Sequence, residues 1–212
     1  NAVAGQLAIA MRQIADHQEL ERLSKTDGLT GLMNRRAFQD ALEAAMARAE
    51  RDGKPGAMLY IDLDNFKAIN DNCGHDVGDS VLREISDILM SHSRSYDLVA
   101  RVGGDEFAVW LNDLDPESAA RRADEILEAL SHLSDRSGDV AKPLGASIGI
   151  AELDPASGES LREFLVRADA AMYVAKKSGK NGWAVSTKRG EEAVGHTPSA
   201  KDRDSRDGEA DR

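Results

Sequence analysis

Two short acidic stretches carry the residues best suited to chemistry. Residues 62–64 read Asp-Leu-Asp, and residues 103–106 read Gly-Gly-Asp-Glu. Carboxylate oxygens are preferred ligands of hard divalent cations, and glycines let a phosphate approach the backbone closely. Side by side, the two stretches could hold a cation and the phosphates bound to it. Taken alone, the second stretch fits a solvated hairpin equally well, and Asp at a strand end is ordinary.

The residues around these stretches predict the strands that position them. The apolar run at residues 57–61 is typical of a strand buried on both faces, and alternation places Asp62 and Asp64 on the same face of it. Apolar residues on both sides of residues 101–107 predict two strands joined by a tight turn. In such a turn both glycines would supply the positive φ that a primed turn demands.

Helices are expected to cover this sheet. One is predicted to begin near Asn34 and to end before the breaker cluster at residues 52–56, and another to begin with Asp115 as its N-cap. Apolar faces at residues 81–89 and 161–175 predict two more helices. A strand is expected at residues 144–151 and a short edge strand at residues 183–185. The order predicts an α/β (α+β) fold, with a mixed central sheet of about five strands wrapped by helices.

Composition narrows the function classes. The chain has 212 residues, a net charge of −11, 41% hydrophobic residues and one cysteine. The acidic balance argues against nucleic acid as a partner, so a bound nucleotide would need local cations. The single cysteine excludes an internal disulfide and fits a reducing compartment. We expect no membrane span in this chain, and a cytoplasmic domain or the cytoplasmic part of a larger protein.

The chain divides into three segments. Residues 1–24 predict an N-terminal signalling or linker helix, which would either form a short coiled coil or pack back on its own domain. Residues 25–186 form the predicted domain. Residues 187–212 mix charges with Gly, Ser and Pro and are expected to be a disordered tail.

The polar stretch at residues 68–79 precedes a clear helix and holds two candidate binding residues. Asn70 and Asp79 offer an amide and a carboxylate, which together can recognise the edge of a guanine. Cys73 and His75 lack the spacing of a metal set. We interpret them as a small buried thiol and a loop imidazole.

Residues 25–186 resemble the GGDEF domain, the diguanylate cyclase family. The named motif stands at residues 103–107, and five further motifs follow the family's order at residues 26–35, 62–67, 70–79, 147–151 and 168–181. The resemblance implies a fold similar to the palm of nucleotidyl cyclases and polymerases.

The resemblance also implies a site. The site would bind Mg²⁺, or Mn²⁺ in place of Mg²⁺. The implied ligands are Asp62, the backbone carbonyl of Leu63, Asp105 and Glu106. Asp105 and Glu106 are the implied catalytic pair, with Glu106 as a metal ligand or as a base for the attacking hydroxyl. The implied substrate contacts are Asn70 and Asp79 to guanine, Gly103 and Gly104 along the phosphates, and Lys67, Lys176 and Lys180 to the triphosphate. Where Lys180 stands the family often has Arg, and lysine keeps the charge without the bidentate fork.

The implied function is a diguanylate cyclase that condenses two GTP into cyclic di-GMP and two pyrophosphates. Each domain would hold one GTP, so a homodimer is needed, and an upstream sensor domain in the full-length protein would control it. Two alternatives stay open: a catalytically silent module that senses GTP or cyclic di-GMP, and an enzyme that makes an adenine-containing dinucleotide.

A second site is implied at Arg94-Ser95-Tyr96-Asp97, which begins nine positions before Gly103. There the family carries an Arg-x-x-Asp inhibitory site, so Arg94 and Asp97 would bind the product cyclic di-GMP. The alternative is an incidental surface pair.

Overall fold

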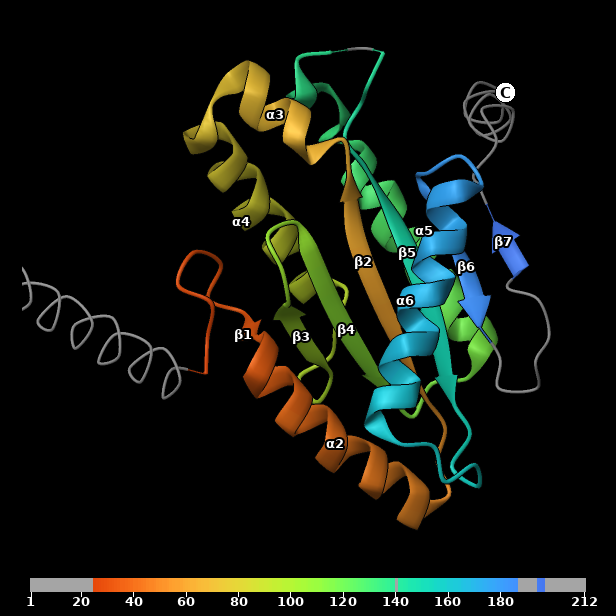
Figure 1. Cartoon of the computed structure of the whole chain (residues 1–212). Coiled ribbons are helices and arrows are strands. Elements are labelled where there is room, and N and C mark those ends of the chain that lie inside the picture. Colours follow the sequence, from red (N-terminus) through yellow and green to blue (C-terminus); the bar gives the residue numbers. More distant parts are fainter. Residues whose placement is uncertain (1–24, 140, 187–193, 197–212) are drawn as a thin grey trace, which may run out of the picture.

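The computed structural model describes residues 25–139, 141–186 and 194–196. The predictions for residues 1–24, and for most of the tail, lie outside the described residues. The described elements are β1 (Met33–Asn34), α2 (Arg35–Asp52), β2 (Gly56–Asp64), α3 (Phe66–Cys73), α4 (His75–Ser91), β3 (Leu98–Arg101), β4 (Glu106–Asn112), α5 (Pro116–Ser131), the 3₁₀ turn η1 (Ser134–Ser137), β5 (Gly145–Leu153), α6 (Leu161–Lys177), β6 (Gly182–Ser186) and β7 (Val194–His196) (Figure 1).

The described strands form one mixed sheet in the order β1-β3-β4-β2-β5-β6-β7. The central strand β2 pairs antiparallel with both β4 and β5, whereas β5 and β6 run parallel. This confirms the predicted α/β class with a mixed sheet. Two strands were not among the predicted five, and both are short. β1 has two residues. β7 has three residues, lies within the segment predicted to be the tail, and pairs with β6. Strands of this length leave no periodic pattern in a sequence.

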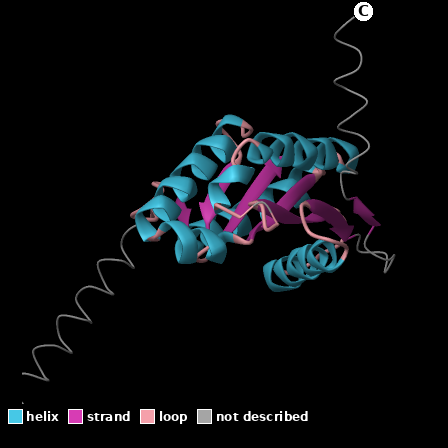
Figure 2. Cartoon of the chain, turned by 90° about the horizontal axis from the view of Figure 1, so that it is seen from above, coloured by secondary structure: helices cyan, strands magenta, loops and turns pink. Residues whose placement is uncertain are grey.

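Helices cover both faces of the sheet (Figure 2). Leu59, Ile61 and Leu63 face the core shared with α3, α4 and α5. Met58 faces the other core, where α2 and α6 pack. Because side chains alternate along a strand, Asp62 and Asp64 lie on the α2/α6 face at the end of β2.

The predicted helix starts agree with the structure. The side chain of Asn34 accepts the Ala37 N–H at 2.9 Å and caps α2. The side chain of Asp115 accepts the Ser118 N–H at 2.8 Å and caps α5. Each of these caps satisfies an N–H group that a helix leaves unpaired in its first turn.

Residues 68–79 differ from the expectation. They belong to two helices, α3 and α4, which are separated by Gly74 with φ of 88°. A residue with a Cβ rarely adopts this φ, so glycine permits the sharp break. The predicted loop imidazole, His75, is the first residue of α4. The predicted buried thiol, Cys73, is exposed.

Within the described residues, no helix is both long and apolar enough to span a membrane.

Candidate functional site

The Gly-Gly stretch lies in the hairpin between β3 and β4, as predicted. The N–H groups of Val102 and Gly103 both donate to the Glu106 carbonyl, at 2.9 and 3.2 Å. The predicted reason for the glycines is wrong, because neither Gly103 nor Gly104 has a positive φ. Space explains Gly103 instead: a Cβ there would lie 2.3 Å from Glu106 Oε2. A Cβ on Gly104 would meet nothing within 4 Å, so only Gly104 leaves open room above the hairpin.

Two arginines hold this hairpin. The Arg101 guanidinium donates to the Gly104 carbonyl at 2.7 and 3.1 Å and pairs with Asp27 at 3.2 Å. From α2, Arg35 Nε donates to the Val102 carbonyl at 2.6 Å, and its Nη2 lies 3.4 Å from Glu106 Oε2. The sequence alone indicates no role for either arginine.

The acidic groups of β2 and the hairpin come together. Asp62 and Glu106 are direct partners in the β2–β4 register, and the Leu63 N–H donates to the Asp105 carbonyl at 3.1 Å. Asp62 is only 9% exposed. Its pKa is raised by burial and by the nearby Asp105 and Asp64 charges, against the lowering effect of the Lys176 ammonium. Lys176 Nζ lies 2.7 Å from Asp62 Oδ2.

This donor set has the chemistry of a magnesium site. Asp62, Asp105 and Glu106 offer carboxylate oxygens, and Leu63 adds a backbone carbonyl. Asp62 already pairs with a cation, the Lys176 ammonium. In the described part of the chain, however, no three or more His, Cys, Asp or Glu side chains are already arranged for a metal ion. To share an ion, these carboxylates would have to turn toward one another.

A cavity of about 360 Å³ lies beside the hairpin. Five of the predicted site residues line it, namely Lys67, Asn70, Asp79, Gly104 and Asp105. Four other residues line it that sequence reasoning did not assign, namely Phe66, His75, Leu82 and Arg101. Six other residues predicted for the substrate and metal site are not among those that line the cavity, namely Asp62, Leu63, Gly103, Glu106, Lys176 and Lys180.

The two predicted guanine contacts come from neighbouring helices. Asn70 lies on α3 and Asp79 on α4. Gly78 lets the Asn70 side chain lie close against α4, because a Cβ at this position would lie 2.1 Å from Asn70 Oδ1. A glycine inside a helix therefore has a local purpose here.

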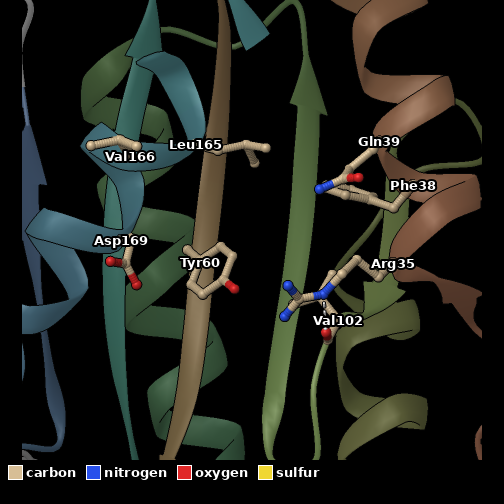
Figure 3. Close-up of a pocket in the computed structure, with 8 residues that line it drawn as sticks. All are labelled: Arg35, Phe38, Gln39, Tyr60, Val102, Leu165, Val166 and Asp169. Carbon is tan, nitrogen blue, oxygen red and sulfur yellow. Dashed lines mark hydrogen bonds between the residues drawn. The ribbon is translucent and has the colours of Figure 1, made fainter. Parts of the chain in front are cut away.

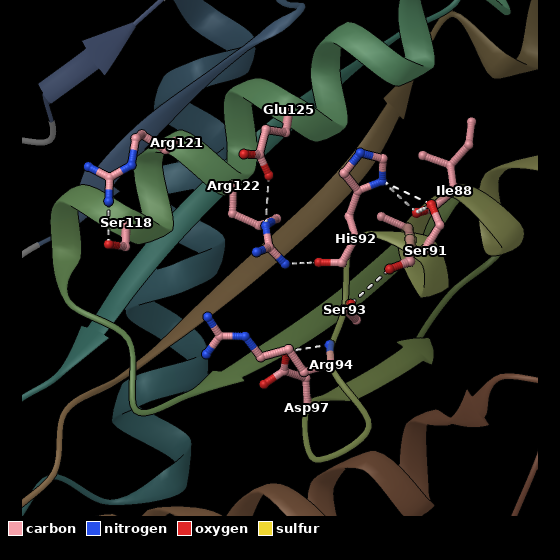
Figure 4. Close-up of polar contacts among 11 residues, drawn as sticks. Ile88, Ser91, His92, Ser93, Arg94, Asp97, Ser118, Arg121, Arg122 and Glu125 are labelled. Carbon is pink, nitrogen blue, oxygen red and sulfur yellow. Dashed lines mark hydrogen bonds and ion pairs between the residues drawn. The ribbon is translucent and has the colours of Figure 1, made fainter.

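Arg94 and Asp97 form a turn at the other end of β3 (Figure 4). Asp97 accepts the Arg94 N–H at 2.8 Å and the Asn112 N–H at 3.0 Å. Both Asp97 oxygens thus accept hydrogen bonds from backbone N–H groups. The Arg94 side chain is exposed, and its Nη1 contacts Tyr96 Oη at 2.9 Å. On α5, Arg122 pairs with Glu125 and donates to the His92 carbonyl just before this turn.

A second cavity, of about 230 Å³, lies on the α2/α6 face (Figure 3). Side chains from α2, β2 and α6 converge on it, among them Arg35, Tyr60 and Asp169. Burial raises the pKa of Tyr60, and the Glu106 charge adds to the shift. No motif in the sequence indicates a site here.

Comparison with known proteins identifies the family. The family described as "Diguanylate cyclase, GGDEF domain" matches residues 24–182. The chain is 41% identical over 167 residues to the "Bifunctional diguanylate cyclase/cyclic di-GMP phosphodiesterase MucR" of Pseudomonas aeruginosa, covering 79% of this chain and 24% of that protein. It is 42% identical over 175 residues to "Response regulator PleD" of Caulobacter vibrioides, covering 81% of this chain and 37% of that protein. The chain thus spans less than half the length of these relatives.

Among solved structures, the coiled coil and GGDEF domain of DgcB from Caulobacter crescentus, in complex with c-di-GMP, superposes with a TM-score of 0.69. The two chains are 34% identical, and the match covers 87% of this chain and 96% of that one. The fold is therefore that of a GGDEF structure.

Proposed function

The chain belongs to the GGDEF diguanylate cyclase family, and we propose that two copies of it condense two GTP into cyclic di-GMP and two pyrophosphates at a homodimer interface. The observation that carries this proposal is the 360 Å³ cavity beside the hairpin, which gathers cationic, amide and carboxylate side chains from α3, α4 and the hairpin. A nucleoside triphosphate needs such a mixture of groups, because its base is neutral and its phosphates are anionic.

Each domain binds one GTP. Asn70 and Asp79 hydrogen-bond the guanine edge, and a site built this way rejects bases that lack the matching donors and acceptors. Lys67, Lys176 and Lys180 neutralise the triphosphate, which lies along Gly103 and Gly104. The acidic body of the protein makes these local cations necessary.

The metal site consists of Asp62, Asp105, Glu106 and the Leu63 carbonyl. When bound there, Mg²⁺, or Mn²⁺ in its place, would neutralise charge at the phosphates and make the attacking hydroxyl more acidic. Glu106 lies in register with Asp62 and contacts Arg35, which orients its carboxylate.

The reaction consists of two equivalent steps. In each, the 3′-hydroxyl oxygen of one GTP bonds to the α-phosphorus of the other, the bond from that phosphorus to the α,β-bridging oxygen breaks, and pyrophosphate leaves. The hydroxyl proton passes to Glu106, which acts as the base. Because one domain holds one GTP, the two steps require two domains face to face.

Product inhibition is the second part of the proposal. The exposed Arg94 binds cyclic di-GMP through a guanine or phosphate edge, where a guanidinium can donate two parallel hydrogen bonds. Asp97 belongs to the same site and holds its turn. We also propose that a sensor domain in a longer protein controls dimer geometry, and that the domain works in the cytoplasm, where GTP is available.

Turnover by purified protein tests the proposal. The chain is incubated with GTP and Mg²⁺ or Mn²⁺ at several protein concentrations, and products are separated by chromatography. We expect cyclic di-GMP, formed at a rate that rises more steeply than linearly with protein concentration. Asp105→Ala should lower the rate by about 10³-fold or more, because it removes a metal ligand. Asp113→Asn is the matched control, since Asp113 lies beyond the far end of β4 and pairs with Lys54.

Retained activity in Asp105→Ala would contradict the site. A silent sensing module is the second candidate, and it is favoured by the Lys176 ammonium that already occupies Asp62. That candidate predicts binding of GTP or cyclic di-GMP with no product at any protein concentration. Parallel incubations with ATP, alone and in competition with GTP, test the third possibility, an adenine-containing product.

A further inference from the structure

Asp64 is a buried carboxylate that the proposed reaction does not use. It ends β2 and is only 3% exposed. Each of its oxygens lies 3.0 Å from Ser147 Oγ on β5, and Oδ2 also accepts the Asn181 N–H at 2.9 Å. A carboxylate so deeply buried persists only with such partners. Both of its oxygens are therefore occupied by groups of the protein itself.

The turn that Asp64 contacts has an unusual backbone. Gly179, Lys180 and Asn181 follow α6 with φ values of 119°, 64° and 47°. Left-handed conformations are unfavourable for residues with a Cβ, so Lys180 and Asn181 must be held there by their surroundings. The Asn181 side chain also packs over Gly145, where a Cβ would lie 3.0 Å from Asn181 Oδ1. The turn is therefore fixed from β2 by Asp64 and from β5 by close packing.

This turn sets the position of Lys180. Lys180 Nζ donates to Asn65 Oδ1 at 3.1 Å, and the Asn65 amide donates to the Pro143 carbonyl at 2.8 Å. Asn65 is itself left-handed, with φ of 63°. Four residues earlier, in the last turn of α6, Lys176 forms an ion pair with Asp62. Both lysines thus contact residues at the acidic end of β2, and Asp64, the last residue of that strand, bonds the turn directly.

We propose that Asp64 is a positioning residue for the triphosphate: it holds the 179–181 turn against the end of β2 so that Lys180 points at the phosphates. The proposal rests on the proposed function, which assigns Lys180 to the triphosphate. Asp64 touches neither GTP nor metal in this account. Removing it should weaken GTP binding through Lys180 and leave the other contacts intact.

A double-mutant cycle measures this coupling. The probe is a GTP analogue with a methylene in place of the α,β-bridging oxygen, titrated into the full chain by calorimetry at fixed Mg²⁺. We expect Asp64→Ala to raise the Kd about tenfold in the wild-type background and less than about twofold in Lys180→Ala. Asn70→Ala is the matched control background: it weakens binding at the guanine end, so there Asp64→Ala should keep its full tenfold effect.

Further readouts separate positioning from a merely structural role. Asp64→Asn can still accept the Asn181 N–H and should restore the Kd to within about threefold of wild type. If Asp64→Ala does not fold, Asp64→Ser enters the cycle, because its side chain is too short to reach Asn181. The Mg²⁺ concentration that gives half of the maximal analogue binding should be the same in the Asp64 variants as in wild type, whereas Asp62→Asn should raise that concentration.

Each result has a definite meaning. Equal Kd increases in the wild-type and Lys180→Ala backgrounds overturn the positioning role. A raised Mg²⁺ requirement, like that of Asp62→Asn, makes Asp64 a metal ligand and also overturns it. Binding does not depend on turnover: a chain that shows the coupling but makes no cyclic di-GMP contradicts only the proposed function. No binding of the analogue contradicts both.

Discussion

The two ends of the β3–β4 pair use arginine and carboxylate side chains in opposite ways. At the hairpin end, Arg101 and Arg35 donate to the backbone carbonyls of Gly104 and Val102. Arginine holds the backbone there, and Asp105 lines the cavity. At the other end, Asp97 accepts two backbone N–H groups, and Arg94 is left exposed.

The difference indicates which ligand each end can take. In each region, the charge that holds the backbone is opposite to the charge that remains for a ligand. A hairpin braced by cations presents carboxylates, which suit a metal ion. A turn braced by a carboxylate presents a guanidinium, which suits a phosphodiester or a guanine edge. The two regions can therefore be disabled separately.

Substitution of Arg101 should have the largest effect on activity. We expect Arg101→Gln to lower kcat/KM for GTP about 100-fold, because the loop that carries Asp105 loses its hold on Gly104 and Asp27. Cyclic di-GMP binding at the turn should be unchanged. Steady-state kinetics and product titration measure the two effects.

The control is Arg51→Gln, since Arg51 is exposed on α2 and pairs only with its neighbour Asp52 among the ion pairs described. Equal losses of activity in both variants would mean that net charge matters and the bracing of the hairpin does not.

Arg94 tests the other end. Arg94→Ala should weaken inhibition by cyclic di-GMP about 20-fold, in line with the loss of a charge-assisted hydrogen-bond pair. The rate without added product should stay the same, since Asp97 continues to hold the turn through the backbone N–H of residue 94. Initial rates at rising cyclic di-GMP measure the shift. An unchanged inhibition constant would make Arg94 an incidental surface residue.

Sequence reasoning succeeded where the signal is local. The caps Asn34 and Asp115 act on N–H groups three residues away, and the apolar run before Asp62 needs no distant partner to be read as a buried strand. Five residues that the family resemblance implies for the site line one cavity, and their roles there stay predictions.

It failed where the partner is distant in sequence. Arg101 pairs with Asp27, 74 positions away, and Arg35 reaches Val102, 67 positions away. No spacing rule connects such residues in a single sequence. The reason for Gly103 was also hidden, since a glycine signals a missing side chain without saying whether φ or space requires it. Here the Glu106 carboxylate requires the space.

Arg35 holds the same hairpin end as Arg101 but from a different element, the helix α2. It contacts Val102 and Glu106 but lies outside the residues that line the 360 Å³ cavity. We therefore expect Arg35→Gln to lower kcat about fivefold, with little change in KM for GTP. Steady-state kinetics at saturating metal measure both constants. A change confined to KM would mean that Arg35 binds substrate.

The Asp27–Arg101 pair should give the smallest effect, on stability. Burial raises the pKa of Asp27, but hydrogen bonds from Thr30 and the Arg101 guanidinium outweigh it and hold the pKa below that of an ordinary aspartate. A lowered folded-state pKa means that the unfolded chain binds the proton more readily, so this stabilisation is full above the unfolded pKa and is lost as pH falls through the folded one.

We expect Asp27→Asn to cost about 1 kcal/mol of unfolding free energy at pH 7 and less below about pH 4. Urea unfolding at both pH values measures the difference. In Arg101→Gln, the unfolding free energy should depend less on pH over the same range. A cost for Asp27→Asn that stays constant with pH would mean that the carboxylate charge does not brace the hairpin, and that the Asx-type bond to Thr30 alone stabilises this turn.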